Sequence, residues 1–362
     1  MNKLGFIVAL VCVAGQLHAD DPPWLSDVAL PAKSASDDAV KEPIPTLANS
    51  SELEAYRSKV LKQWSNILGT IEPSDHSSPK AKILEKVEHE PGLTRSLIEY
   101  ETEPGQMVQA FVLEPSESTN SKKLPGVVIF HSTVENSIFQ PVGLSGKDDS
   151  TSVSSDELRK AYAVHLARRG FVTLSPRNFL WPTNIGIAAK EQAAAFHERH
   201  PKAKGMARML LDSVKAIDVL CNWDGVDNKR LGAIGHSLGA KEVLYLAAFD
   251  ERIKAAVSSE GGLGIAQSNW DAPWYLGPGC TNANFVWDHH QLLASVAPRA
   301  FLLIGGEASD GSKSLPYLIE AHKAFVAWGK PAQLGFYNHK QGHHVTDESL
   351  ARSIGWLEWQ LK

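Results

Sequence analysis

The chain has 362 residues, of which 43% are hydrophobic and 21% charged, and its formal net charge is −5. This composition is typical of a globular protein and excludes collagen-like, coiled-coil and wholly disordered chains. Neither sign of charge gathers into a basic stripe, so we expect no nucleic-acid partner. After the first twenty residues no apolar run is long enough to cross a membrane.

The N-terminus has the pattern of a secretory signal peptide over residues 1–19. Lys3 supplies a positive charge, an apolar stretch follows, and Leu17-His18-Ala19 is a tolerable cleavage site. We therefore expect a protein that is secreted or periplasmic, with no membrane attachment after cleavage. Residues 20–80 are predicted to form an N-terminal extension with one amphipathic helix from Glu52, and residues 81–362 the main domain.

Two kinds of hydrophobic pattern follow each other in the main domain. Alternating polar and apolar residues predict antiparallel strands, and these are expected at 82–89, 97–103 and 107–113. Beyond Pro125, short and continuously apolar runs alternate with helical segments, which is typical of strands buried on both faces. These strands are expected at 127–130, 171–174, 230–234, 253–257, 301–304 and 333–337. The helices are expected at 157–169, 206–221, 241–248, 316–328 and from 347. The order predicts an α/β fold with a mostly parallel sheet, flanking helices and an antiparallel N-terminal edge.

The sharpest motif is Gly-His-Ser-Leu-Gly at 235–239, directly after one predicted strand and directly before a helix. This context is that of a nucleophile elbow, in which a strained turn exposes a serine hydroxyl at the top of the sheet. Glycine at 235 and at 239 lets neighbouring backbone approach closely. The motif predicts Ser237 as a nucleophile; the alternative is a Gly-rich turn whose serine only caps the helix.

A serine nucleophile needs a histidine base, which in this kind of fold follows the last strand. His343 is the preferred candidate and His344 the alternative, while His339 follows the strand so closely that a structural role is expected. A shared metal site for the three histidines would need a helix here, and Gly342 argues against one. We therefore expect no metal and no cofactor.

Two carboxylates compete for the role of the acid that orients the base. Asp310 lies in the loop after the strand 301–304, which is the usual position and the preferred one. Glu260 follows the strand 253–257, one strand earlier. Either one is equally understood as a turn carboxylate that accepts from a backbone amide, so the sequence leaves the choice open.

Other expected parts of the site are backbone amides and loop aromatics. The oxyanion donors are predicted to be the N–H groups of Leu238 and Thr133. The long connection 264–290 is rich in aromatic residues, which form either a substrate-binding wall or a small core that packs the loop down. The tryptophans concerned are Trp270 and Trp274 in this connection and Trp181 in another loop. Cys221 and Cys280 are either disulfide-bonded or buried thiols.

From about Lys82 onward the chain resembles the α/β-hydrolase superfamily, in particular the dienelactone-hydrolase-like and carbohydrate-esterase branches that include acetyl xylan esterases and glucuronoyl esterases. The resemblance to glucuronoyl esterases rests on Lys241, on 249–253 and on 259–262. In that family the matching lysine contacts the sugar acid and the matching glutamate can serve as the acid. The chain departs from the family at Leu238, where an arginine is usual, and at His236, where a cysteine is usual.

The resemblance implies a secreted serine hydrolase that cleaves carboxylic esters through an acyl-enzyme, on acetyl or glucuronoyl esters of a polysaccharide. Two alternatives are a hydrolase-fold protein that binds carbohydrate without turnover, and a peptidase or dienelactone-type hydrolase, because the fold alone does not choose the substrate. The sequence predicts no particular oligomeric state.

Overall fold

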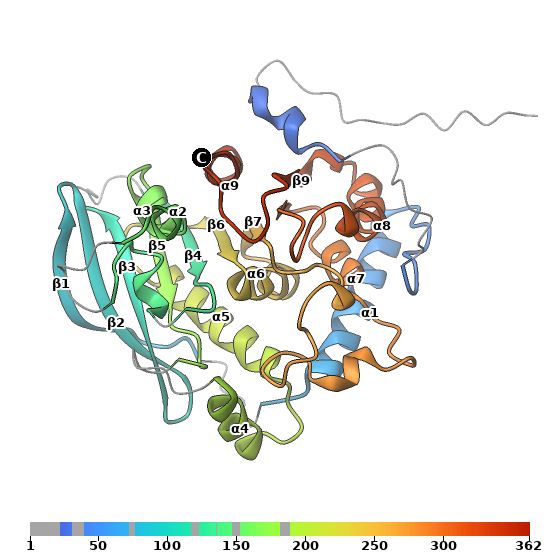
Figure 1. Ribbon diagram of the computed structural model, residues 1–362, viewed down its shortest axis with the longest axis horizontal. Coiled ribbons are helices and arrows are strands. Elements are labelled where there is room, and N and C mark those ends of the chain that lie inside the picture. The colour runs from blue at the N-terminus through green and yellow to red at the C-terminus, as the bar shows by residue number, and fades with distance from the viewer. Residues whose placement is uncertain are drawn as a thin grey trace, which may run out of the picture.

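The computed structural model describes residues 22–30, 40–71, 77–116, 123–134, 136–146, 153–181 and 189–362. The predicted signal peptide lies outside these ranges. The described strands form a single sheet in the order β1-β2-β3-β5-β4-β6-β7-β8-β9, drawn in Figure 1. Their bounds are β1 Lys82–Glu90, β2 Leu93–Glu103, β3 Gln106–Pro115, β4 Leu124–Phe130, β5 Val172–Pro176, β6 Val226–His236, β7 Ile253–Ser259, β8 Ala300–Gly305 and β9 Leu334–Asn338.

The type of strand pairing changes once across the sheet, from antiparallel to parallel at β5. β1, β2, β3 and β5 pair antiparallel, whereas β5, β4, β6, β7, β8 and β9 pair parallel. The residues of β5 and β8 are all buried, which explains their continuously apolar sequences. The expected α/β fold with an antiparallel N-terminal edge is therefore confirmed, and the carboxyl ends of its parallel strands meet at one edge.

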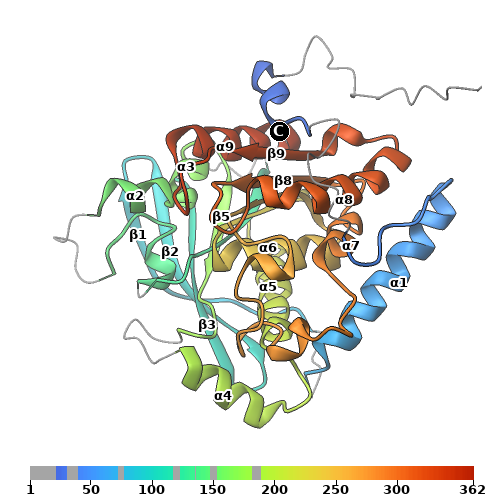
Figure 2. The same cartoon turned by 45° about the vertical axis from the view of Figure 1, so that its right-hand side comes forward.

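Helices cover both faces of the sheet (Figures 1 and 2). Their bounds are α1 Ser50–Leu68, α2 Ser155–Arg159, α3 Tyr162–Ala167, α4 Ala189–Arg199, α5 Gly205–Cys221, α6 Leu238–Phe249, α7 His289–Ala294, α8 Leu315–Ala327 and α9 Asp347–Leu361. The larger hydrophobic core joins one face to α1, α5, α6, α7 and α8. The smaller core joins the other face to α3 and α9. Most residues of β4, β5, β7 and β8 are buried between the two cores.

The helix predicted at 157–169 is wrong as one element. It is divided into α2 and α3 at Ala161, whose φ of −74° and ψ of 54° are not helical. No residue of α2 is buried, whereas Tyr162 begins a helix that is buried over most of its length. The break lets α3 follow the sheet while α2 stays at the surface. Two short helices, α4 and α7, were not predicted.

The N-terminal extension packs along the domain. The 3-10 helix η1, Pro23–Val28, places Trp24 edge-on to Trp359 of α9, with ring centroids 6.4 Å apart. The predicted amphipathic helix is confirmed as α1, and its Trp64 is fully buried and stacked on His289. The domain boundary near residue 80 stays a prediction. Within the described ranges no helix is long and apolar enough to span a membrane.

Candidate active site

Ser237 occupies the turn between β6 and α6. Its φ of 60° and ψ of −114° lie in a region that residues other than glycine rarely adopt. Its backbone N–H donates to the carbonyl of Ser259 at the end of β7, over 2.8 Å, which holds the turn against the neighbouring strand. The side chain is thereby presented at the carboxyl edge of the sheet, where the loops after the parallel strands meet.

The two glycines of the motif permit this turn through close backbone contact. A Cβ at Gly235 would lie closer than 3.0 Å to the backbone of Gly239, and one at Gly239 would lie closer than 3.0 Å to the carbonyl of Phe130. Backbone atoms, unlike the end of a flexible side chain, cannot rotate away from such a contact. The start of α6 can therefore approach the end of β4 only without side chains at these two positions.

His343 joins Ser237 to Glu260 by two hydrogen bonds. The Ser237 hydroxyl and the Nε2 atom of His343 are 2.9 Å apart, and Nδ1 of His343 lies 3.2 Å from Oε2 of Glu260. A carboxylate only accepts, so Nδ1 carries the proton and Nε2 is free to accept from the serine. This chain of contacts can remove a proton from Ser237 and stabilise the charge that forms on the imidazole.

Glu260 is held more tightly than its partners. Its side chain is 1% exposed, and its two oxygens accept from the N–H groups of Gly306 and Ser309, the latter over 2.6 Å. Its own backbone has a φ of 56°, a left-handed value that is uncommon for glutamate. The carboxylate is thus fixed by backbone donors from the loop after β8 and aimed at His343.

The structure corrects the preference for Asp310. Asp310 is fully buried in the expected loop after β8, but its carboxylate accepts from the N–H groups of Gly262 and Leu263, each over 2.7 Å, and from the hydroxyl of Ser314. Burial raises the pKa of Asp310. The carboxylate of Asp310 is thus occupied by two backbone N–H groups and a serine hydroxyl. The carboxylate that contacts His343 is that of the alternative candidate, Glu260.

The other histidines have different surroundings. His344 is exposed and lies 3.5 Å from Asp156, so it does not take the place of His343. His339 is partly buried, and its Nδ1 accepts from the N–H of Gln341, as expected of a structural residue. The buried ring of His236 packs on His343, with centroids 4.8 Å apart. This last contact gave no signal in the sequence, because His236 comes from the end of β6 and His343 from the loop after β9.

The two predicted oxyanion donors lie at the edge where Ser237 is exposed. Leu238 is the first residue of α6, and an N–H group in the first turn has no acceptor within its own helix. Thr133 is exposed and closely follows β4. The backbone before it is held by His131, whose buried ring contacts the Ser132 carbonyl, the Ser137 hydroxyl and the Asn178 N–H. Burial lowers the pKa of His131 to about 4, so this ring is neutral.

The residues expected to bind substrate are mostly inside the protein. Lys241 is 3% exposed and Trp270 is 1% exposed, and the Trp270 indole donates to the carbonyl of Gly262. Trp181 is also buried, against His131, whereas Trp274 is half-buried. The connection 264–290 was expected to form either a substrate-binding wall or a small core, and the buried Trp270 fits the small core.

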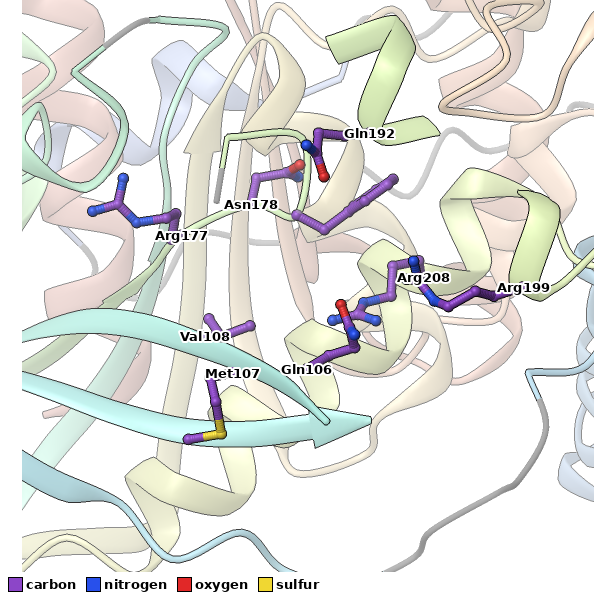
Figure 3. A pocket seen from close by; sticks show the side chains of 9 residues that line it. Gln106, Met107, Val108, Arg177, Asn178, Gln192, Arg199 and Arg208 are labelled. Atoms are coloured by element: carbon purple, nitrogen blue, oxygen red, sulfur yellow. The ribbon is translucent and has the colours of Figure 1, made fainter. Parts of the chain in front are cut away.

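A pocket of about 50 Å³ lies beside this edge, between the start of β3, the loop after β5, and α4 and α5. Figure 3 shows Arg208 and Arg199 together on one side of it, with the guanidinium of Arg177 pointing away from them. Glu103 accepts from both Arg208 and Arg199, and Asp212 pairs with Arg208. These ion pairs offset the charges of Arg208 and Arg199 and join β2 to α4 and α5.

The described residues hold no group of three histidine, cysteine, aspartate or glutamate side chains placed to bind a metal ion. Cys221, which is partly exposed, and the buried Cys280 are both free thiols. No disulfide therefore joins these two positions, and the interpretation as a buried thiol fits Cys280, whereas Cys221 is only partly buried.

Comparison with known proteins gives the class of protein. The nine-stranded sheet, with its serine between β6 and α6, is an α/β-hydrolase fold. Residues 152–295 match the model of the dienelactone hydrolase family. The expected resemblance to this superfamily and its esterase branches is thus confirmed. No curated protein matches the chain.

Solved structures with this fold include several carbohydrate esterases. A glucuronoyl esterase from Solibacter usitatus has a TM-score of 0.67 and 15% identity, covering 91% of this chain and 100% of its own. A CE15 glucuronoyl esterase from Teredinibacter turnerae T7901 has a TM-score of 0.63 and 19% identity, covering 92% and 93%. An acetyl xylan esterase from Paenibacillus sp. R4 has a TM-score of 0.51 and 16% identity, covering 88% and 97%. At these identities the likeness is one of fold.

Proposed function

We propose that the protein is an exported serine esterase that hydrolyses carboxylic esters attached to a polysaccharide. The observation that carries the proposal is the hydrogen-bonded chain from Ser237 through His343 to Glu260, with distances of 2.9 and 3.2 Å. The match to a hydrolase family model and the carbohydrate esterases among the structures of like fold support the same class of reaction.

The mechanism follows from the positions of these groups. Ser237 attacks the ester carbonyl while Nε2 of His343 takes its proton, and Glu260 stabilises the imidazolium that results. The N–H groups of Leu238 and Thr133 donate to the oxyanion of the tetrahedral intermediate; loss of one such donor typically lowers kcat by about 100- to 1000-fold. The imidazolium then protonates the leaving alcohol, and water, activated by the same histidine, releases the acid from the acyl-enzyme.

The openness of the site leaves room for a bulky alcohol. The side chain of His343 is 43% exposed, so the group that protonates the leaving oxygen is accessible from solvent. A polymer chain can reach such an atom without entering a closed pocket. Export, predicted from residues 1–19, would bring the enzyme to polysaccharides outside the cytoplasm.

Hydrolysis of p-nitrophenyl acetate by the wild type and by Ser237→Ala tests the proposal. The variant is expected to lose about three orders of magnitude or more in kcat. Ser258→Ala is the matched control, because Ser258 is a buried serine on the neighbouring β7 whose hydroxyl donates to the carbonyl of Ala240. Equal rates for the wild type and Ser237→Ala would refute the esterase, and a panel of acetylated xylan and methyl glucuronate esters would identify the acyl group.

A further inference from the structure

Lys241 has its ammonium group engaged inside the protein. It lies on the first turn of α6, and its Nζ donates to the carbonyl of Gly261 and, over 2.8 Å, to the hydroxyl of Ser268. The same atom sits 4.2 Å from the centre of the Trp270 ring and 5.2 Å from that of Tyr275. An ammonium has three donors, and these partners surround it, so little of the group is left for a sugar.

Asp310 holds the same loop from the other side. Its two carboxylate oxygens accept from the consecutive N–H groups of Gly262 and Leu263, both over 2.7 Å. Its backbone carbonyl accepts from the N–H groups of Gly306 and Glu307. One residue therefore ties the loop after β7 to the loop after β8. Its negative charge also lies near Lys241 and partly offsets the burial that lowers the pKa of that lysine to about 7.

Glu260 lies where these two sets of contacts meet. Lys241 fixes the carbonyl of the next residue, Gly261, and Asp310 fixes the two residues after that. Asp310 also holds Gly306, whose N–H donates to the Glu260 carboxylate. The left-handed backbone of Glu260, with φ of 56°, persists only if its surroundings hold it there. If either contact is lost, the loop can relax and carry the carboxylate away from the histidine.

We propose that Lys241 and Asp310 are positioning residues that form a clamp on residues 260–263 and hold Glu260 against His343. Lys241 then acts on the reaction through Glu260, without contact with the sugar. This inference rests on the proposed function, because it assumes that Glu260 orients the catalytic histidine. Asp310, which the sequence analysis preferred as the catalytic acid, then has a positioning role in the same site.

A substrate without any sugar distinguishes positioning from sugar binding. Lys241→Met keeps the buried stem and removes the ammonium, so for p-nitrophenyl acetate we expect kcat to fall by about tenfold to hundredfold, with KM changed by less than about twofold. The acid limb of the pH–rate profile is expected to move to lower pH, because a displaced carboxylate no longer favours the imidazolium. Asp310→Asn has one acceptor oxygen in place of two. It is expected to lower kcat and to move the acid limb of the pH–rate profile in the same directions.

Lys254→Met is the matched control, since Lys254 is an exposed lysine of β7 whose Nζ donates only to the nearby carbonyl of Glu251. It is expected to behave as the wild type. The proposal is overturned if Lys241→Met keeps the wild-type rate and pH profile on p-nitrophenyl acetate while its KM for a sugar ester rises, which is the signature of a ligand. If Lys241→Met does not fold, Asp310→Asn decides alone, and an unshifted profile refutes the clamp. If the proposed esterase function is wrong, the wild type and Ser237→Ala will have equal rates, which is a different result from failure of the clamp.

Discussion

The substitution Glu260→Gln tests the assignment of the acid most directly, because it keeps the shape of the side chain and removes its charge. One carboxylate oxygen accepts from the N–H of Ser309 over 2.6 Å and faces Nδ1 of His343 at 3.2 Å. The other oxygen accepts from the N–H of Gly306. Whichever way the new amide turns, its NH₂ group points at a backbone N–H. In one orientation the part-buried N–H of Ser309 loses its acceptor, and in the other the N–H of Gly306 keeps only the carbonyl of Asp310.

The size of the effect follows from these contacts. A buried donor without an acceptor costs about 1–3 kcal/mol, which is the upper bound for the fall in the free energy of unfolding. The effect on catalysis is larger, because the amide cannot stabilise an imidazolium and favours the wrong tautomer of His343. The equivalent aspartate-to-asparagine change in serine proteases lowers kcat by about 10⁴. We expect a loss of about 10³ to 10⁴ in kcat, which is about 4 to 5.5 kcal/mol of transition-state stabilisation.

The assay is release of p-nitrophenol between about pH 5 and pH 9 by the wild type, Glu260→Gln and Asp310→Asn, with Ser237→Ala as the background. Asp310→Asn should retain about one tenth to one hundredth of the wild-type kcat, since it disturbs the acid only indirectly. The assignment is wrong if Glu260→Gln keeps more than about a tenth of the wild-type kcat, or if Asp310→Asn loses more activity than Glu260→Gln. Urea unfolding of each variant separates lost activity from lost structure.

Three further outcomes follow from the packing. Gly239→Ala would push a Cβ into the carbonyl of Phe130 and should abolish activity and lower the unfolding midpoint, whereas Gly279→Ala meets no described atom within 4 Å and should leave both unchanged. Trp64→Ala removes a fully buried indole and should lower the free energy of unfolding by about 3–5 kcal/mol in urea titrations; a loss below about 1 kcal/mol would mean that α1 is not part of the core. Burial lowers the pKa of His289 from 6.5 to about 3. Below pH 6.5 the unfolded chain therefore binds a proton that the fold does not, and stability should fall by about 1.4 kcal/mol per pH unit from this residue; an unchanged slope in His289→Gln would contradict this.

Much of the fold could be predicted because its signals are local. The apolar runs of the parallel strands predict burial on both faces, and β5 and β8 are buried throughout. The motif around Ser237 is equally local, since strand, turn and helix follow each other within a few residues. The division of the predicted helix at Ala161 left no such signal, because it depends on which part of the segment packs on the sheet.

The acid of the site could not be chosen by the same reasoning. Glu260 and Asp310 each follow a parallel strand, and β7 and β8 are neighbours, so both carboxylates come near the same edge of the sheet. Which one meets His343 depends on the hydrogen bonds that each accepts from backbone N–H groups. Those of Asp310 belong to residues 262 and 263, which are distant in sequence and close only in the fold.

The sequence by itself determined the strands and most of the helices along the chain, the serine at the tight turn and a histidine after the last strand, because hydrophobic periodicity and glycine placement act over short stretches of chain. Only the tertiary structure decided that Glu260 faces the histidine, that Asp310 braces the loop behind it, and that Lys241 and Trp270 are buried. The physical reason is that these roles depend on which donor lies within about 3 Å of which acceptor across separate loops, and such distances are set by the packing of the whole domain.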